Sequence, residues 1–217
     1  MAWEINLCKA RLVPYENTPF TSEQLRGFFG YFFMDDEGFH HHGESQKYSY
    51  PMVQYKKIGD EVLIIGLGDY AKVLEQRIQD ASWIAVPSGT LRIKRMEVKR
   101  SKAVVEKKCC RYRFLTPWIA LNQGNYNKLR LLSKEKQLPE LERILTGNLL
   151  SFLKGLGIFI DFRLETHIED WRETVAKAHG NEFEAFYATF TSNLAIPELV
   201  GIGKSVSKGF GALGWVR

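Results

Sequence analysis

The spacing of apolar residues near the start of the chain predicts a strand followed by a helix. The apolar-rich run from Ile5 to Val13 is typical of a strand, although apolar residues occur on both of its faces. Thr21 and Gln24 have the spacing of a capping box, which indicates that a helix begins there. The apolar residues of this helix recur at i, i+3, i+4, i+7 and i+8, so they share one face. They are Leu25, Phe28, Phe29, Phe32 and Phe33.

The pattern then predicts a hairpin, a second helix and a further strand. Residues 52–58 and 61–67 flank Gly59-Asp60, a two-residue hairpin sequence. Apolar residues at helical spacing follow, and a strand begins near Trp83. The apolar face of that second helix consists of Tyr70, Val73, Leu74 and Ile78. The predicted order β-α-β-β-α-β is the split βαβ arrangement of ferredoxin-like folds.

The second half of the chain is less regular. Its predicted elements are a strand over 109–121, helices over about 126–134 and 138–154, and long strands near 162–177 and 182–192. A turn at His179-Gly180-Asn181 joins the last two strands, and a glycine-rich tail follows from Pro197. This order suits a second, reduced copy of the first unit in which the tail replaces the last helix. We therefore predict an α+β fold of tandem ferredoxin-like (RRM-like) domains, residues 1–105 and 106–217, with a C-terminal glycine-rich loop.

The composition excludes several classes of protein. Of 217 residues, 45% are hydrophobic and 25% charged, which is typical of a globular domain and too apolar for disorder. The apolar stretch from Leu149 to Ile160 is interrupted by Lys154 and glycines, so no membrane-spanning segment is expected. Three cysteines, two of them adjacent and none in CxxC spacing, give neither a disulfide framework nor a zinc motif. We expect a reduced, cytoplasmic protein without a resident metal or cofactor.

Positive charge is concentrated in the basic segment, residues 92–113. Ten basic residues occur there against Glu97 and Glu106, a net charge of +8, whereas the whole chain has only +5. The ten are Arg92, Lys94, Arg95, Lys99, Arg100, Lys102, Lys107, Lys108, Arg111 and Arg113. Such a density favours phosphate binding, and the other interpretation is a solvated strand pair that joins two domains.

The tail contains a glycine loop, residues 201–211, in which two Gly-apolar-Gly triplets are separated by five residues. Glycine lets backbone N–H groups approach a ligand closely, and lysine and serine add phosphate contacts. The candidate RNA-binding residues are Gly201, Gly203, Lys204, Ser205, Ser207, Lys208, Gly209 and Gly211.

Three other interpretations compete with phosphate binding by this loop. A nucleotide P-loop requires glycine where Glu198 stands, so that motif fails. Residues 208–211 match the start of the RNP1 pattern of RNA-recognition motifs, but Ala212 occupies the position of its stacking aromatic. A merely flexible tail does not account for paired triplets flanked by Phe210 and Trp215.

Three of the five histidines are consecutive, at His40-His41-His42 after the first helix. With an unperturbed pKa near 6.5, two imidazoles beside one phosphate can act as base and acid. Lys47 could stabilise the negative charge on a pentavalent phosphorane formed during cleavage. Tyr48 could orient the phosphate or donate a hydrogen bond to it. A solvated surface run stays open, as does a metal site with the neighbouring carboxylates Asp35, Asp36 and Glu37.

Taken together, these features resemble the CRISPR-associated endoribonucleases of the sixth Cas family, which cut repeat transcripts into guide RNAs. The glycine loop fits that family's Gly-apolar-Gly motif pair without a gap. The histidines at 40–42 stand where the family commonly keeps catalytic histidine, and the segment from Tyr48 to Lys56 looks like its second-strand entry.

The resemblance implies metal-independent cleavage, in which the 2′-hydroxyl attacks the phosphate, the 5′-oxygen leaves and a 2′,3′-cyclic phosphate forms. His40 and His42 would exchange the protons, and His41 ranks third because side chains alternate in an extended segment. Tyr48 would orient the phosphate, and Lys47 would stabilise the negative charge that develops on it. The glycine loop and the basic segment would hold the repeat RNA.

The expected partner is CRISPR repeat RNA and not a membrane, and other Cas subunits or a second copy of the chain stay open. A non-catalytic RNA-binding subunit of a CRISPR ribonucleoprotein complex is the alternative function. A metal-dependent nuclease that uses the histidines with Asp35 or Asp36 is a third.

Overall fold

The computed structural model describes residues 2–15, 19–33, 50–178 and 180–216. The chain divides into two compact units, each considered by itself. The N-terminal unit comprises Ile5–Ala103 with Ser207–Gly209, and the C-terminal unit comprises Met1–Glu4, Val104–Val206 and Phe210–Arg217. Within the described part of the chain, no helix is both long and apolar enough to cross a membrane.

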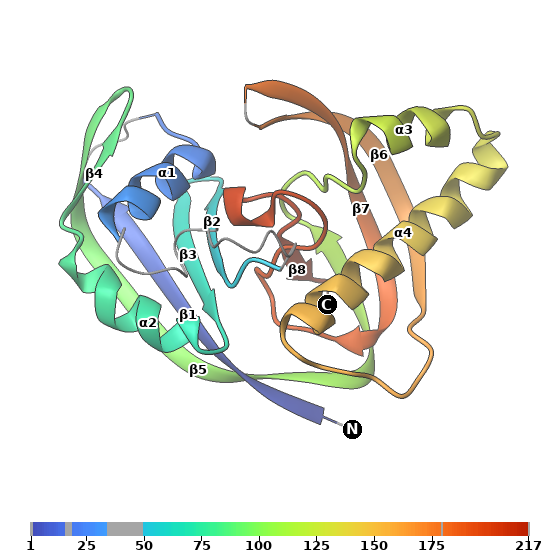
Figure 1. Ribbon diagram of the computed structural model, residues 1–217, viewed down its shortest axis with the longest axis horizontal. Helices are drawn as coiled ribbons and strands as arrows, with labels where there is room; N and C mark the ends of the chain where they lie inside the picture. The colour runs from blue at the N-terminus through green and yellow to red at the C-terminus, as the bar shows by residue number, and fades with distance from the viewer. Residues whose placement is uncertain (1, 16–18, 34–49, 179, 217) are drawn as a thin grey trace, which may run out of the picture. The chain divides into compact units, whose positions relative to one another are not determined.

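The N-terminal unit has the predicted split βαβ order (Figure 1). Its elements are β1 (Ala2–Pro14), α1 (Ser22–Phe32), β2 (Val53–Ile58), β3 (Glu61–Leu67), α2 (Tyr70–Arg77), the 3₁₀ turn η1 (Ile78–Asp80), β4 (Trp83–Val86) and the start of β5 (Gly89–Phe114). Strand β3 lies between β1 and β2 and is antiparallel to both, with Ile64 opposite Ala10 on one side and Tyr55 on the other. This arrangement confirms the ferredoxin-like prediction for the unit.

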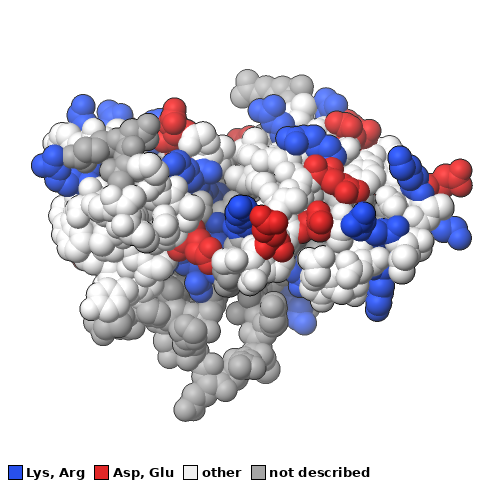
Figure 2. All heavy atoms as spheres, turned by 90° about the horizontal axis from the view of Figure 1, so that it is seen from above, with Lys and Arg blue, Asp and Glu red and all other residues white. Residues whose placement is uncertain are grey.

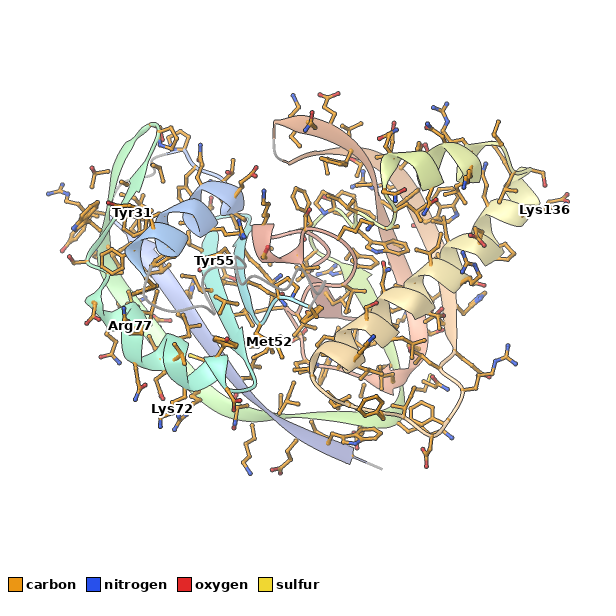
Figure 3. The ribbon with its side chains drawn as sticks, in the orientation of Figure 1. Tyr31, Met52, Tyr55, Lys72, Arg77 and Lys136 are labelled. Carbon is orange, nitrogen blue, oxygen red and sulfur yellow. The ribbon has the colours of Figure 1, made fainter. Side chains whose placement is uncertain are left out.

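Helix α1 begins and packs as its sequence predicts. The Thr21 N–H donates to Gln24 Oε1 at 2.9 Å, and the Gln24 N–H donates to Thr21 Oγ1 at 3.2 Å, which completes the capping box. Phe29 is fully buried, and its ring stacks on Tyr55 of β2 with centroids 5.8 Å apart. Figure 3 shows the Tyr55 side chain between β2 and α1. One face of the sheet therefore packs on the helices.

Strand β5 differs most from the prediction. It extends over 26 residues, from Gly89 to Phe114, whereas the sequence indicated a strand over 109–121. Apolar residues alternate with charged ones there only in two short runs, 91–94 and 96–99, and the extra charged residue Arg95 puts them out of step, so no continuous alternation marks the strand. It ends before Pro117, which has no N–H to donate to a ladder. The whole basic segment therefore lies on one strand, which passes from the N-terminal unit into the C-terminal unit at residues 103–104.

The C-terminal unit is the reduced copy. Its further elements are α3 (Gln123–Arg130), α4 (Lys134–Gly155), β6 (Thr166–Ala178), β7 (Asn181–Ala195), the 3₁₀ turn η2 (Val206–Lys208) and β8 (Leu213–Trp215). Strand β7 pairs antiparallel with both β5 and β6, and β8 pairs with β5. Helix α4 begins four residues before the predicted Leu138, because Pro139 interrupts the sequence pattern without ending the helix. Strand β6 begins at Thr166 rather than near 162.

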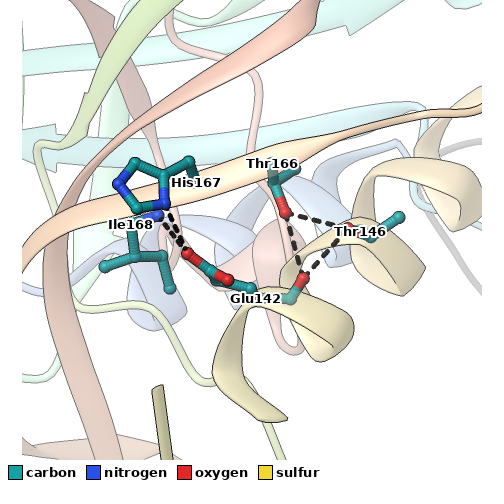
Figure 4. Close-up of polar contacts among 5 residues, drawn as sticks. All are labelled: Glu142, Thr146, Thr166, His167 and Ile168. Carbon is teal, nitrogen blue, oxygen red and sulfur yellow. Dashed lines mark hydrogen bonds and ion pairs between the residues drawn. The ribbon is translucent and has the colours of Figure 1, made fainter. Parts of the chain in front are cut away.

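Polar contacts hold α4 to β6 (Figure 4). The Glu142 carboxylate accepts from the Ile168 N–H at 2.9 Å and lies 3.0 Å from Nδ1 of His167. The Thr146 and Thr166 hydroxyls lie 2.8 Å apart, and both donate to the Glu142 carbonyl. His167 is largely exposed, so its contacts are those of a surface residue joining a helix to a strand.

Candidate nucleic-acid interface

The glycine loop is closely packed by its own chain. Gly203 has φ +104°, and a Cβ there would lie 2.7 Å from the Trp118 ring. Gly211 has φ +64°, and its Cβ would lie 1.9 Å from the Ile202 carbonyl oxygen. The Ile202 N–H also donates to the Gly211 carbonyl at 2.9 Å. Segments of the same chain approach these positions too closely for any side chain, so glycine is required there. The sequence did not indicate this packing reason for the glycines.

Two side chains of the glycine loop face outward from this packed backbone. Lys204 is exposed, while its N–H donates to the Ile119 carbonyl at 2.9 Å. Ser205 is half-buried and has φ +54°, a left-handed conformation that is uncommon for serine. The backbone thus holds Lys204 in place while its ammonium is accessible to a phosphate.

Residues 207–209 belong to the N-terminal unit instead. Lys208 is buried, and its ammonium pairs with the Glu23 carboxylate in the first turn of α1. Gly209 has φ +96°, and a Cβ there would lie 2.5 Å from Ser22 Oγ and 3.0 Å from the Tyr55 carbonyl. Ser207 is also buried. The sequence suggested that Ser207 and Lys208 contact phosphate, whereas the structure buries both side chains and pairs Lys208 with α1.

The ten basic side chains of β5 are all exposed, but most have neighbours. Four form ion pairs: Arg95 with Glu97 at 2.9 Å, Arg100 with Glu75 at 3.1 Å, Arg111 with Glu169 at 2.7 Å and Lys108 with Glu106 at 3.9 Å. Two lie over aromatic rings, Arg92 over Tyr15 and Lys107 over Phe162. Within the described ranges, Lys94, Lys99 and Arg113 form no ion pair.

The basic segment is therefore partly neutralised rather than uniformly positive. Figure 2 shows basic and acidic side chains interspersed on the face that it draws. Exposed ion pairs contribute only about 0–1 kcal/mol, so a phosphate can replace their carboxylates at little cost. Glu75 of α2 and Glu169 of β6 are distant in sequence from the arginines that they pair with.

The predicted catalytic residues His40, His41, His42, Lys47 and Tyr48 lie outside the described residues, as do Asp35 and Asp36. The nearest described residue after them is Tyr50, whose hydroxyl accepts from Gln54 Nε2 at 2.7 Å. Among the residues that the structure does describe, no group of His, Cys, Asp and Glu could hold a metal ion.

Sequence reasoning missed two buried polar side chains on β2. Gln54 and Lys56 are both 0% exposed, although each belongs to a residue type that is mostly found at the surface. The sequence singles out residues 48–56 as a strand entry, and within them only Tyr48 as a candidate catalytic residue.

Two ferredoxin-like units, the second reduced and carrying most of the glycine loop, define a tandem ferredoxin-like protein. Residues 4–103 match the family model for the Cas6b N-terminal domain, and residues 104–216 match that for the Cas6b C-terminal domain. The chain therefore belongs to the Cas6b family, which confirms the resemblance inferred from its motifs.

Two solved structures agree with this assignment, and one further protein is similar to part of the chain. A crystal structure of Cas6b is 29% identical, with a TM-score of 0.88, and the match covers 99% of this chain and 100% of that one. A crystal structure of the CRISPR RNA processing endoribonuclease Cas6b is 28% identical, with a TM-score of 0.77 and the same coverage. An uncharacterized protein of Methanocaldococcus jannaschii is 38% identical over 117 residues, which are 54% of this chain and 80% of that protein.

Proposed function

We propose that this protein is a metal-independent endoribonuclease that cleaves CRISPR repeat transcripts into guide RNAs. The observation that carries the proposal is the match of both halves of the chain to the two Cas6b domain models. The similar structure described as a CRISPR RNA processing endoribonuclease supports the same activity. The test is incubation of the chain with repeat RNA in a chelating buffer, followed by mapping of the cut and its end groups.

In the proposed reaction, the ribose 2′-hydroxyl upstream of the scissile phosphate attacks the phosphorus. One imidazole of His40 and His42 removes the hydroxyl proton, and the other protonates the departing 5′-oxygen. The products are a 2′,3′-cyclic phosphate and a 5′-hydroxyl. Tyr48 orients the phosphate and Lys47 stabilises the negative charge that develops on it.

RNA binding is assigned to the two regions that the sequence singled out. In the glycine loop, Lys204 and Ser205 are the side chains accessible to a phosphate, and the buried residues around them fix the backbone. On β5, Lys94, Lys99 and Arg113 can bind phosphate without breaking an ion pair. We further propose that residues 1–105 supply catalysis and residues 106–217 supply the RNA-binding loop.

The alternative is a non-catalytic subunit that binds repeat RNA within a ribonucleoprotein complex. It predicts tight binding of the repeat and no cut, with or without chelator. Other Cas subunits and a second copy of the chain are further proposed partners, and a cytoplasmic location stays a prediction.

Removal of the three unpaired charges of β5 is expected to weaken RNA binding and to reduce its dependence on salt. Each phosphate contact on a single strand contributes about 0.7 to the slope of log affinity against log salt. The variant Lys94→Ala/Lys99→Ala/Arg113→Ala should therefore lose about 2 from that slope. Binding is measured from 50 to 400 mM salt with a repeat RNA that carries a 2′-deoxy nucleotide at the mapped cut.

A matched control removes three exposed lysines elsewhere, in the variant Lys72→Ala/Lys136→Ala/Lys177→Ala. It changes the net charge equally and should leave the slope close to that of the parent. Equal losses of slope in both variants would show that net charge, and not β5, governs binding.

A further inference from the structure

Lys56 is a completely buried lysine without a polar partner. It lies on β2 opposite Leu63 of β3, and its exposure is 0%. Its Nζ has no hydrogen-bond partner among the residues that the structure describes. Lysine is almost never fully buried unless it is paired, because removal of an ammonium from water is strongly unfavourable. The residue therefore indicates a requirement beyond packing.

The strand directs Lys56 away from the helices. Side chains alternate along a strand, and Tyr55 stacks on Phe29 of α1, so Lys56 and Gln54 share the opposite face. Gln54 is satisfied there, since its Nε2 donates to the Tyr50 hydroxyl and to the Pro51 carbonyl. Lys56, by contrast, has no acceptor for its Nζ within the part of the chain that the structure describes.

No charged group of the described residues compensates Lys56, since burial is the only cause of the shift of its pKa. The nearest acidic residue along the hairpin, Glu61 of β3, pairs with Arg11 at 3.0 Å. Burial alone lowers the pKa of the Lys56 ammonium to about 7. The group therefore stands near the midpoint of its titration at neutral pH, and a nearby anion would favour the charged form.

The glycine loop passes directly beside this lysine. A Cβ on Gly209 would lie 3.0 Å from the carbonyl oxygen of Tyr55, the residue before Lys56. Residues 207–209 pack in the same unit as β2. The loop proposed to bind the RNA backbone thus touches the strand that holds the unpartnered amine.

We propose that Lys56 is a phosphate-binding residue of the RNA site. The proposal rests on the RNA-binding function assigned above. Its flexible four-carbon stem lets Nζ turn toward a phosphodiester at the loop. The neutral amine takes one proton from solvent and becomes an ammonium, and no other bond changes.

The proposal predicts that RNA affinity depends on pH and that this dependence disappears when Lys56 is replaced. Above about pH 7 the free protein holds Lys56 neutral, so binding takes up a proton, and affinity falls up to about tenfold per pH unit. Lys56→Met should bind about tenfold more weakly at pH 6.5 and should lack this fall between pH 7.5 and 9. Lys57→Met is the matched control, because Lys57 lies on the same strand over the Phe20 ring and should retain the fall.

The experiment measures affinity for the uncleavable deoxy-substituted repeat at constant ionic strength from pH 6.5 to 9. Calorimetry in buffers of different ionisation enthalpy counts the protons taken up by the parent at pH 8, which does not depend on the variant folding. Binding by the parent without proton uptake, or an unchanged pH profile in Lys56→Met, overturns the role of Lys56. No binding by the parent overturns the proposed function itself, and this inference with it.

Discussion

Replacement of both His40 and His42 by alanine is expected to reduce the rate of repeat cleavage by about 10⁴-fold or more. General acid–base catalysis typically contributes about 10²–10⁴-fold for each group, and this variant loses the base and the acid together. Affinity for the uncleavable repeat should be unchanged, because the proposed binding contacts lie on β5 and in the glycine loop. The rate is measured in single turnovers with saturating enzyme in a chelating buffer.

Two single variants serve as controls for the histidines. His41→Ala should keep its rate within about tenfold of the parent, because the sequence ranks it third: if the segment is extended, its side chain would alternate with those of His40 and His42. His167→Ala should cleave like the parent, since that imidazole lies on β6 beside Glu142. A double variant that cleaves at the parental rate would show that other groups move the protons.

The second large effect is expected from Gly211→Ala, which should lower the free energy of unfolding by more than about 3 kcal/mol. The left-handed conformation at φ +64° costs an alanine about 1–2 kcal/mol. In addition, its Cβ would lie 1.9 Å from the Ile202 carbonyl oxygen. The Ile202 N–H donates to the Gly211 carbonyl, which holds the two residues against each other, so the clash cannot relax cheaply. The melting temperature should fall by roughly 10 °C, read by circular dichroism.

Gly157→Ala separates the two contributions to that loss. Gly157 has φ +69°, and nothing lies within 4 Å of a Cβ placed there. This control should therefore show the backbone cost alone, about 1–2 kcal/mol. Equal losses in the two variants would contradict the close packing of the glycine loop.

Local sequence patterns predicted most of the N-terminal unit. The capping box at Thr21 and the hairpin at Gly59-Asp60 depend on residues close in the chain, and the structure has both. The first part of β5 was missed because its alternation of apolar and charged residues is short and is interrupted at Arg95. The start of α4 was missed because Pro139 lies inside that helix.

The candidate site depends on contacts that no local pattern carries. Lys208 pairs with Glu23 from 185 positions away, so the sequence alone favoured a phosphate contact for it. In the sequence, Lys56 resembles its neighbour Lys57, and only the fold shows that one is buried without a partner while the other lies over an aromatic ring. The glycine motif was recognisable because the spacing of its glycines is a local feature of the sequence. The packing role of those glycines was not recognisable, because it depends on residues distant in the sequence.

The central claim is that the ribose hydroxyl attacks and that no cation is needed. It is tested most directly by one comparison in a chelating buffer, between an all-ribose repeat and the same repeat with a single 2′-deoxy nucleotide upstream of the cut. We predict complete cleavage of the first, with a cyclic phosphate end, and none of the second. Cleavage of the deoxy repeat, or activity that disappears in chelator and returns with a divalent cation, would contradict the account.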